Sequence, residues 1–254
     1  MVHIIIPSPG YRQVLQECVD SIERLTETKD YEILLVNTKT EEDDEKEVEL
    51  AKRYGNIRIH NAGYYHYATI NNKAALGWFG DFPEDDYLLF CNDDIEFKTD
   101  CVSKMLEVAK SGNDVGTVGA LLYFPDGSIQ HAGVGLDPKT INCYHIGYKA
   151  RFEVAPTGEK AVYANTAALM MIKVSNFKRL NGFDEEFQIC FEDLDLNLRA
   201  TKEFGLTNHI CYDAVATHKE SITRGKELSA SDIWRIRSKM ADYMYYMVKR
   251  SDTK

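Results

Sequence analysis

The first hundred residues alternate between short apolar runs and stretches with the spacing of amphipathic helices. These runs and stretches follow one another at residues 4–6, 11–25, 33–36, 41–54, 57–59, 68–80 and 87–91. Because parallel neighbouring strands need a crossover connection that is usually a helix, the alternation predicts an α/β fold with a mainly parallel sheet and helices on both faces. Ligands of such sheets bind beyond the carboxyl ends of the strands, so we expect a site just after Ile6, Val36 and Cys91.

After residue 98 the pattern is less regular. It predicts a helix at 99–110, a hairpin that turns at 125–128, a functional loop or lid over 137–160 and a buried run at 163–173. A last helix carries a stripe at helical spacing, formed by Ile233, Trp234, Arg237, Met240, Met244, Met247 and Val248. No repeat or linker interrupts the chain, so we predict a single domain with halves at 1–98 and 99–225 and a C-terminal helical extension at 226–254.

The charge of the chain argues against a general nucleic-acid binder. Asp and Glu number 40 against 30 Lys and Arg, a formal net charge of −10, whereas phosphate recognition usually needs a basic stripe. Half of that charge lies in residues 41–47, which hold six acids and one base. We interpret this run as the solvated start of a helix, with Thr40 as its N-cap and the acids favoured by the helix dipole.

Cysteine usage and the short apolar runs bear on the compartment. The six cysteines are scattered and form no CxxC pair, which favours free buried thiols over a disulfide framework or a zinc site. The sequence enters its first apolar run at Val2 without the features of a signal peptide, and no apolar run approaches the ~20 residues of a membrane span. We therefore expect a cytoplasmic protein.

An acidic pair stands at the end of the apolar run 87–91, in the sequence Asn92-Asp93-Asp94. Carboxylates in this position can hold a hard divalent cation such as Mg²⁺ or Mn²⁺, whose other coordination positions suit a diphosphate. The same residues are good turn formers, so a polar turn that merely ends a strand is the alternative.

Two further segments carry candidate chemistry. Glu192 and Asp193 open a predicted helix, where the dipole stabilises carboxylates, and a carboxylate fixed there could also act as a general base. His218 follows an apolar run and is either a metal ligand or a polar residue satisfied by its neighbours. The residues by themselves leave these alternatives open.

Taken together and in this order, the three candidates resemble glycosyltransferase family 2 of the GT-A fold, and its rhamnosyltransferase-like members in particular. The similarity spans residues 2–225. It includes the segments at 4–7, 67–74, 119–123, 125–133 and 182–187. The resemblance implies a nucleotide-sugar-binding half at 1–98 and an acceptor-binding half at 99–225, with a small hairpin and a C-terminal helix beside the central sheet.

The resemblance implies a role for each candidate. Asp94 would ligate the metal that bridges the donor diphosphate, His218 would complete the metal site, and Asp93 would face the donor ribose. Asp193 would be the general base of an inverting transfer, with Glu192 beside it.

The resemblance also implies a nucleotide pocket lined by Pro7, Ser8, Asn37, Asn71 and Asn72. Asn37 stands where many members carry the aspartate that reads the base, Asn71 where some carry arginine, and Asn92 where the DxD motif begins. An amide offers a different donor and acceptor pattern from a carboxylate, so UDP is the default donor nucleotide and dTDP or GDP are alternatives. His131 either is a structural residue of the hairpin or faces the acceptor or the sugar.

We therefore predict a metal-dependent inverting glycosyltransferase of polysaccharide synthesis, with Mn²⁺ or Mg²⁺ as cofactor. It would move a hexose or deoxyhexose from a nucleoside diphosphate to a glycan or lipid-linked glycan. A catalytically silent sugar-binding module is one alternative. A sugar-nucleotide pyrophosphorylase is another, although residues 7–12 lack its glycine-rich phosphate loop. We expect the C-terminal helix to pack on the core or to form a dimer contact, with peripheral membrane attachment as the alternative.

Overall fold

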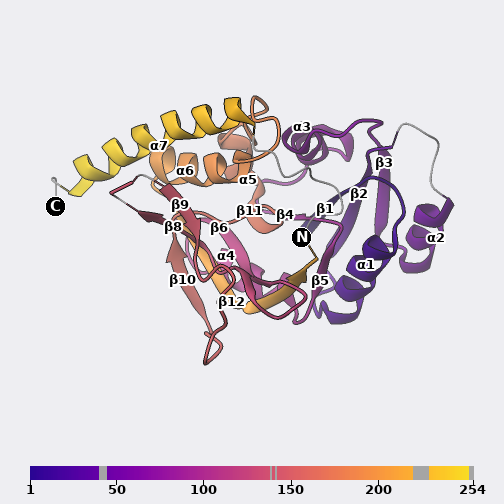
Figure 1. Ribbon diagram of the computed structural model, residues 1–254. Coiled ribbons are helices and arrows are strands. Elements are labelled where there is room, and N and C mark those ends of the chain that lie inside the picture. The colour runs from indigo at the N-terminus through magenta and orange to yellow at the C-terminus, as the bar shows by residue number, and fades with distance from the viewer. Residues whose placement is uncertain (40–44, 138, 141, 220–228, 252–254) are drawn as a thin grey trace.

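The computed structural model describes residues 1–39, 45–137, 139–140, 142–219 and 229–251. A ten-stranded sheet runs through the molecule in the order β10-β12-β6-β11-β4-β1-β2-β3, with β5 paired to β12 and β7 paired to β6 (Figure 1). A two-stranded sheet of β8 and β9 accompanies it. The strands are β1 (Val2–Ser8), β2 (Tyr31–Asn37), β3 (Ile57–Asn61), β4 (Tyr87–Cys91), β5 (Ile95–Phe97), β6 (Val115–Tyr123), β7 (Ile129–His131), β8 (Val134–Asp137), β9 (Asn142–His145), β10 (Glu159–Val162), β11 (Leu169–Lys173) and β12 (Thr207–His218).

The predicted parallel sheet forms the first half of the molecule. β3, β2, β1 and β4 lie side by side and run parallel, so their carboxyl ends share one edge. Beyond β4 the sheet is mixed, because β11 runs antiparallel to both β4 and β6, whereas β12 is parallel to β6. The predicted hairpin is formed by β6 and β7.

Helices cover both faces of the sheet, which explains why its strands read as continuous apolar runs. Side chains of β1 alternate between two cores: Ile4 and Ile6 pack with Leu15, and Ile5 packs with Ile70. The helices are α1 (Gln13–Leu25), α2 (Glu45–Tyr54), α3 (Tyr67–Lys73) with the π-helical turn η1 (Ala74–Trp78), α4 (Cys101–Ala109), α5 (Val174–Arg179), α6 (Glu192–Phe204) and α7 (Ala230–Ser251).

Two local predictions need correction. The segment 137–160 is not a plain loop, since it contains β9 and the start of β10; these strands are largely exposed and therefore lack the apolar alternation that marks a half-buried strand. In the acidic run, Thr40 and residues 41–44 lie outside the described residues. Glu47 is fully buried rather than solvated.

The C-terminal helix packs on the core through only part of the predicted stripe. Met240 and Met244 of the stripe pack in a core shared with α6, together with the buried Ile236 and Tyr243 that the prediction left out, whereas Trp234 is 72% exposed. The side chains of residues 247–251 are not described. In the part of the chain that the structure describes, no helix is both long and apolar enough to cross a bilayer. All six cysteines are free thiols, and Cys143 and Cys190 are only partly buried.

Candidate active site

The carboxyl ends of β1 and β2 bring together three of the predicted nucleotide-pocket residues, Pro7, Ser8 and Asn37. Ser8 pairs with Asn37 in the register of the two strands, and both are buried with Pro7. Thr38 closes the junction, because its backbone N–H and its hydroxyl both donate to the Ser8 carbonyl, at 2.8 and 3.1 Å. The parallel register therefore produces the convergence that the sequence predicts at this edge.

Asn37 is held by a buried carboxylate that sequence reasoning missed. Its Nδ2 donates to Oε2 of Glu47 at 2.8 Å, and its Oδ1 accepts from the Lys39 backbone N–H at 2.9 Å. Asn37 is 1% exposed and Glu47 is 0% exposed. An aspartate at position 37 would face the Glu47 carboxylate at hydrogen-bond distance, so the amide here is required by its neighbour.

The acidic pair after β4 has two different environments. Asp93 is buried and accepts a 2.6 Å hydrogen bond from Nη2 of Arg12. Burial raises the pKa of Asp93, and the Arg12 guanidinium offsets only part of that effect. Arg12 was not among the predicted site residues, and its position just after the carboxyl end of β1 is the signal that points to it.

Asp94 lies against His218 because β12 pairs with β5, which places His218 opposite Ile95. His218 Nε2 is 3.1 Å from Oδ1 of Asp94. Burial would raise the pKa of Asp94, but the hydrogen bond and charge of His218 outweigh it and lower the pKa.

Hydrogen bonds fix the tautomer of His218. Its Nδ1 lies 2.6 Å from Oε1 of Gln130, which can only accept, so Nδ1 carries the proton. In the protonated ring Nε2–H donates to the Asp94 carboxylate across 3.1 Å, and this is the contact that lowers the pKa of Asp94. In the neutral ring Nε2 is a lone-pair nitrogen, to which Nδ2 of Asn92 can donate across 3.3 Å. Nε2 and the Asp94 carboxylate are then two neighbouring acceptors, an arrangement that favours a cation between them. The pair thus fits a divalent metal, although the described residues contain no group of three or more His, Cys, Asp or Glu side chains that could hold one.

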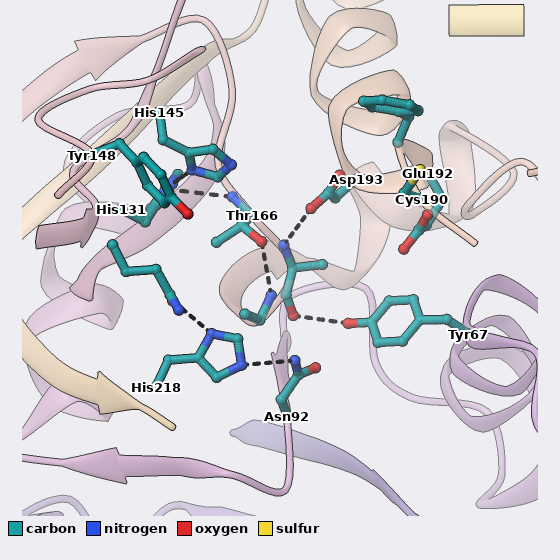
Figure 2. Close-up of a pocket in the computed structure, with 14 residues that line it drawn as sticks. Tyr67, Asn92, His131, His145, Tyr148, Thr166, Cys190, Glu192, Asp193 and His218 are labelled. Carbon is teal, nitrogen blue, oxygen red and sulfur yellow. Dashed lines mark hydrogen bonds between the residues drawn. The ribbon is translucent and has the colours of Figure 1, made fainter. Parts of the chain in front are cut away.

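A pocket of about 240 Å³ extends from His218 of this pair to Asp193, the predicted base (Figure 2). Asn92 and His218 form one side of it, and Glu192 and Asp193 form another. The other lining residues are Tyr67, Gln130, His131, His145, Tyr148, Thr166, Ala167, Ala168, Cys190 and Phe191.

Asp193 sits in the first turn of α6 and its carboxylate is oriented by backbone donors. Oδ2 accepts from the Ala167 N–H at 3.0 Å, and Oδ1 accepts from the Leu194 N–H at 2.7 Å. Glu192, beside it, is buried. The residue before them, Phe191, has a left-handed backbone with φ of 77°, an unfavourable conformation for a bulky side chain that the surrounding contacts must maintain.

A buried amide network supports α6 from behind. Nδ2 of Asn197 donates to the carbonyls of Asp193 and Asn165, at 2.7 and 3.1 Å. Its Oδ1 accepts from the Asn165 N–H at 3.1 Å and from the Thr117 hydroxyl at 2.5 Å. The network therefore ties the first turn of α6 to the segment that leads to Ala167.

His131 contacts a second histidine at the far side of the pocket. Its Nδ1 is 2.9 Å from Nδ1 of His145, and its side chain is 1% exposed. Burial and the neighbouring His145 lower the pKa of His131 well below its ordinary value. Sequence reasoning missed His145 and Tyr148, because they lie in the segment that was interpreted as a loop.

Comparison with protein families decides the classification. The model of the family described as Glycosyl transferase family 2 matches residues 3–175. The chain belongs to glycosyltransferase family 2. The family match and the central sheet agree with the resemblance found in the sequence.

Relatives of this glycosyltransferase include proteins of very different length. It is 31% identical to the uncharacterised protein y4gI of Sinorhizobium fredii, covering 99% of this chain but 28% of that protein. It is 23% identical to the rhamnosyltransferase WbbL of Escherichia coli, covering 78% of this chain and 76% of WbbL. Among solved structures, GalNAc-T7 with UDP, GalNAc and Mn²⁺ superposes with a TM-score of 0.73 at 12% identity, over 96% of this chain and 49% of that one. This last likeness confirms the GT-A fold.

In this glycosyltransferase, the two asparagines of α3 make structural contacts. Asn72 donates from Nδ2 to the Phe183 carbonyl at 2.9 Å and accepts from its N–H at 2.8 Å. Asn71 is fully buried and donates to the Tyr67 carbonyl at 2.9 Å. Neither lines the pocket beside Asp193, so their contact with a donor stays a prediction.

Proposed function

We propose that this glycosyltransferase transfers one sugar, with inversion, from a nucleoside diphosphate to an acceptor hydroxyl in glycan synthesis. The observation that carries the proposal is that Asp193 and His218 line one pocket on different sides, and that His218 contacts Asp94 to form the pair that fits a cation. Such a separation suits a displacement in which a base acts on the attacking oxygen and a cation acts on the departing diphosphate.

Asp193 is the proposed general base. A base must lie within hydrogen-bond reach of the proton that it removes, and Asp193 lines the pocket at the start of α6. Two backbone N–H groups orient its carboxylate, and each oxygen keeps a lone pair that can accept a hydrogen bond from the hydroxyl of the acceptor substrate. The buried Glu192 would act beside it by shaping the same wall of the pocket.

Asp94 and His218 are the proposed metal-holding residues, with Gln130 fixing the ring tautomer. Mn²⁺ or Mg²⁺ bound between them would supply neutralisation of the negative charge on the diphosphate. Such a two-residue set leaves coordination positions for phosphate oxygens and water. The Mn²⁺ and UDP of the structurally similar GalNAc-T7 support this assignment.

The donor nucleotide would lie at the ends of β1, β2 and β4, against Pro7, Ser8 and Asn37, with its ribose near Asp93. UDP is the default nucleotide, with dTDP and GDP as alternatives. The activity named for WbbL supports a deoxyhexose as the sugar. A glycan or lipid-linked glycan is the proposed acceptor. His131, neutral because of its burial, would face the sugar or the acceptor as a hydrogen-bonding group.

The test measures sugar transfer by the wild type, Asp193→Asn, Asp94→Ala and the control Asp81→Asn, which alters an exposed carboxylate. Asp193→Asn is expected to lose a factor of about 10² to 10⁴ in turnover. Asp94→Ala and treatment with EDTA are expected to abolish transfer, while the control keeps it. Near-normal turnover of Asp193→Asn would refute the base, and activity that survives thorough chelation would refute the metal.

The products distinguish the alternative functions. Release of a nucleoside diphosphate supports the transferase, whereas release of pyrophosphate would identify a pyrophosphorylase. Donor binding by calorimetry without turnover on a broad acceptor panel would instead identify a binding module.

A further inference from the structure

We propose that the C-terminal helix α7 is a clamp on the segment that carries the base, and that Asp232 is its principal positioning residue. The proposal rests on the function proposed for Asp193. It concerns a buried carboxylate, about 40 residues further along the chain than the base, that no step of the transfer uses.

Asp232 collects three consecutive backbone N–H groups from another part of the chain. Its Oδ2 accepts from Gln188, Ile189 and Cys190 at 3.1, 2.8 and 3.3 Å, and its Oδ1 accepts from Gln188 at 3.0 Å. Consecutive N–H groups that converge in this way form an anion-binding nest, and here a side chain of the protein fills it. The Asp232 side chain is 0% exposed, and a buried carboxylate needs hydrogen-bond donors such as these to offset the cost of removing it from water.

The nest adjoins the pocket directly. Cys190 is its last residue, and Cys190, Phe191, Glu192 and Asp193 all line the pocket. Phe191 connects the nest to α6 in a left-handed conformation, which persists only where the surrounding structure imposes it. A shift of the nest would therefore move the start of α6 and the Asp193 carboxylate with it.

A second anchor lies two helical turns further along the same face of α7. Nζ of Lys239 donates to Asp184 at 2.8 Å and to Asp195 at 2.6 Å. Seven residues separate Lys239 from Asp232, a spacing that returns to one side of a helix. Burial would lower the pKa of Lys239, but Asp184 and Asp195 outweigh it and raise the pKa.

The two anchors together span the whole base-bearing segment. Asp184 and Asp195 bracket residues 188–193, so α7 holds this stretch at both ends and at its middle. On the same helix, Ile236 between the anchors and Met240 and Tyr243 beyond them are buried in one core with α6. Figure 1 shows α7 lying along α6, as this packing requires.

An ordinary helix-terminal role does not explain Asp232. An acid in the first turn of a helix usually satisfies N–H groups of its own helix. The hydrogen bonds of the Asp232 carboxylate go instead to residues 188–190, more than forty positions earlier in the chain. Its contacts thus serve the pocket segment.

The experiment compares Asp232→Asn with Asp242→Asn, an exposed aspartate on the same helix, in the full-length enzyme. The asparagine turns an N–H donor towards backbone donors and loosens the nest. We expect kcat to fall about 10- to 100-fold, because a displacement of about 1 Å in a catalytic group has effects of that size. UDP binding with Mn²⁺, measured by calorimetry, should change less than twofold. The control should match the wild type in both measurements.

Hydrogen–deuterium exchange provides a readout that does not depend on turnover. Amides 188–190 should exchange faster in Asp232→Asn than in the wild type or the control. Lys239→Met, which removes the second anchor and keeps the stem, should lower kcat in the same direction and serves if Asp232→Asn does not fold. Wild-type kcat together with unchanged exchange at 188–190 in either variant would overturn the clamp.

Parallel assay of Asp193→Asn separates the two proposals. If Asp193→Asn keeps its turnover, the base assignment fails, while the exchange data still decide whether α7 holds the segment. If Asp193→Asn is inactive while Asp232→Asn keeps both the turnover and the 188–190 exchange of the wild type, the clamp alone is refuted.

Discussion

Two regions of the proposed site are built by different means: the donor edge, at the carboxyl ends of β1 and β2 where we propose that the donor binds, and the base wall, at the start of α6 with the proposed base Asp193. At the donor edge, Ser8 and Asn37 end neighbouring parallel strands, and the backbone register sets their relation. At the base wall, Asp193 lies in the first turn of helix α6. The Ala167 N–H donates to its carboxylate, Asn197 of the same helix joins α6 to Asn165, and the Asp232 carboxylate accepts from the segment just before α6. Strand register is a property of the whole sheet, whereas each of these contacts depends on one side chain.

The difference predicts where substitutions act. On the donor edge, the strands keep their positions when a side chain changes, so a substitution should lower stability mainly by placing like charges next to each other. On the base wall, removal of a single side chain should displace the carboxylate of the proposed base, Asp193. The predictions below test this contrast from the largest expected effect to the smallest.

The largest effect is expected from Asn37→Asp. The new carboxylate would replace the Asn37 amide that donates to the buried Glu47 carboxylate at 2.8 Å, so two buried carboxylates would stand at hydrogen-bond distance. The loss of one partner of a buried charged pair destabilises a protein by about 3 to 5 kcal/mol, so the free energy of unfolding in urea should fall by that amount.

A compensating substitution makes this prediction sharp. Adding Glu47→Gln to Asn37→Asp restores one donor and one carboxylate and should recover most of the stability. Asn113→Asp, in an exposed turn, is the control and should change little. If the double variant is as unstable as Asn37→Asp, the departure from the family aspartate has another cause.

On the base wall, Asn197→Ala should destabilise the protein by about 3 kcal/mol and also lower kcat. The substitution removes the Asn197 partner of the buried Asn165 N–H and of the Asn165 carbonyl, and each such group costs about 1 to 3 kcal/mol. Thermal or urea unfolding checks the first effect, and turnover at a temperature where the variant stays folded checks the second. Asn113→Ala is the matched control. Full turnover in a destabilised Asn197→Ala would show that the network supports the fold without positioning Asp193.

This contrast also explains how far the sequence could be interpreted. The alternation of strands and helices predicted the parallel half of the sheet, and with it the convergence of Pro7, Ser8 and Asn37. The family motifs predicted Asp193 and His218, which line one pocket, and Asp94, which contacts His218 at 3.1 Å. Parallel strands that end at one edge need no other information to bring their last residues together.

The residues that hold the site could not be predicted in the same way. Arg12, Glu47 and Asp232 act through single hydrogen bonds to distant partners, and such pairing leaves no periodic pattern in the sequence. β9 was missed for a related reason, since an exposed strand shows no apolar alternation. The face of α7 that packs was predicted only in part because Trp234, although apolar, lies in solvent.

A smaller effect is expected at Gln130, which holds His218 and lines the pocket that His218 shares with Asp193. Gln130→Met keeps the size of the side chain but removes the acceptor that fixes Nδ1–H of His218. Groups that hold a metal-binding histidine by a hydrogen bond change metal affinity by about 10- to 100-fold, so titration of the activity with Mn²⁺ should show Mn²⁺ binding weakened by that factor. Gln13→Met on the exposed start of α1 is the control. An unchanged Mn²⁺ dependence would mean that His218 needs no such orientation or is not a ligand.

The smallest effect concerns pH and the buried His131. Burial and His145 lower its folded pKa below the ordinary 6.5, so the unfolded chain binds a proton at His131 before the folded protein does. Stability contributed by the neutral ring is therefore complete above about pH 6.5 and is lost as the pH falls from there towards the folded pKa. The slope for one proton is at most about 1.4 kcal/mol per pH unit, so His131 should account for about 1 kcal/mol between pH 7.5 and pH 5.5.

Urea unfolding of the wild type and His131→Gln at several pH values isolates this contribution, because the other titrating groups are common to both proteins. The difference in their free energies of unfolding should be constant between pH 7.5 and 8.5 and should change by about 1 kcal/mol, in favour of the variant, on going to pH 5.5. Curves that stay parallel down to pH 5.5 would mean that the pocket admits a charged His131. The side of the pocket formed by His131 and His145 would then tolerate a positive charge, and charge repulsion would affect stability less there than beside Asn37 and Glu47 at the donor edge.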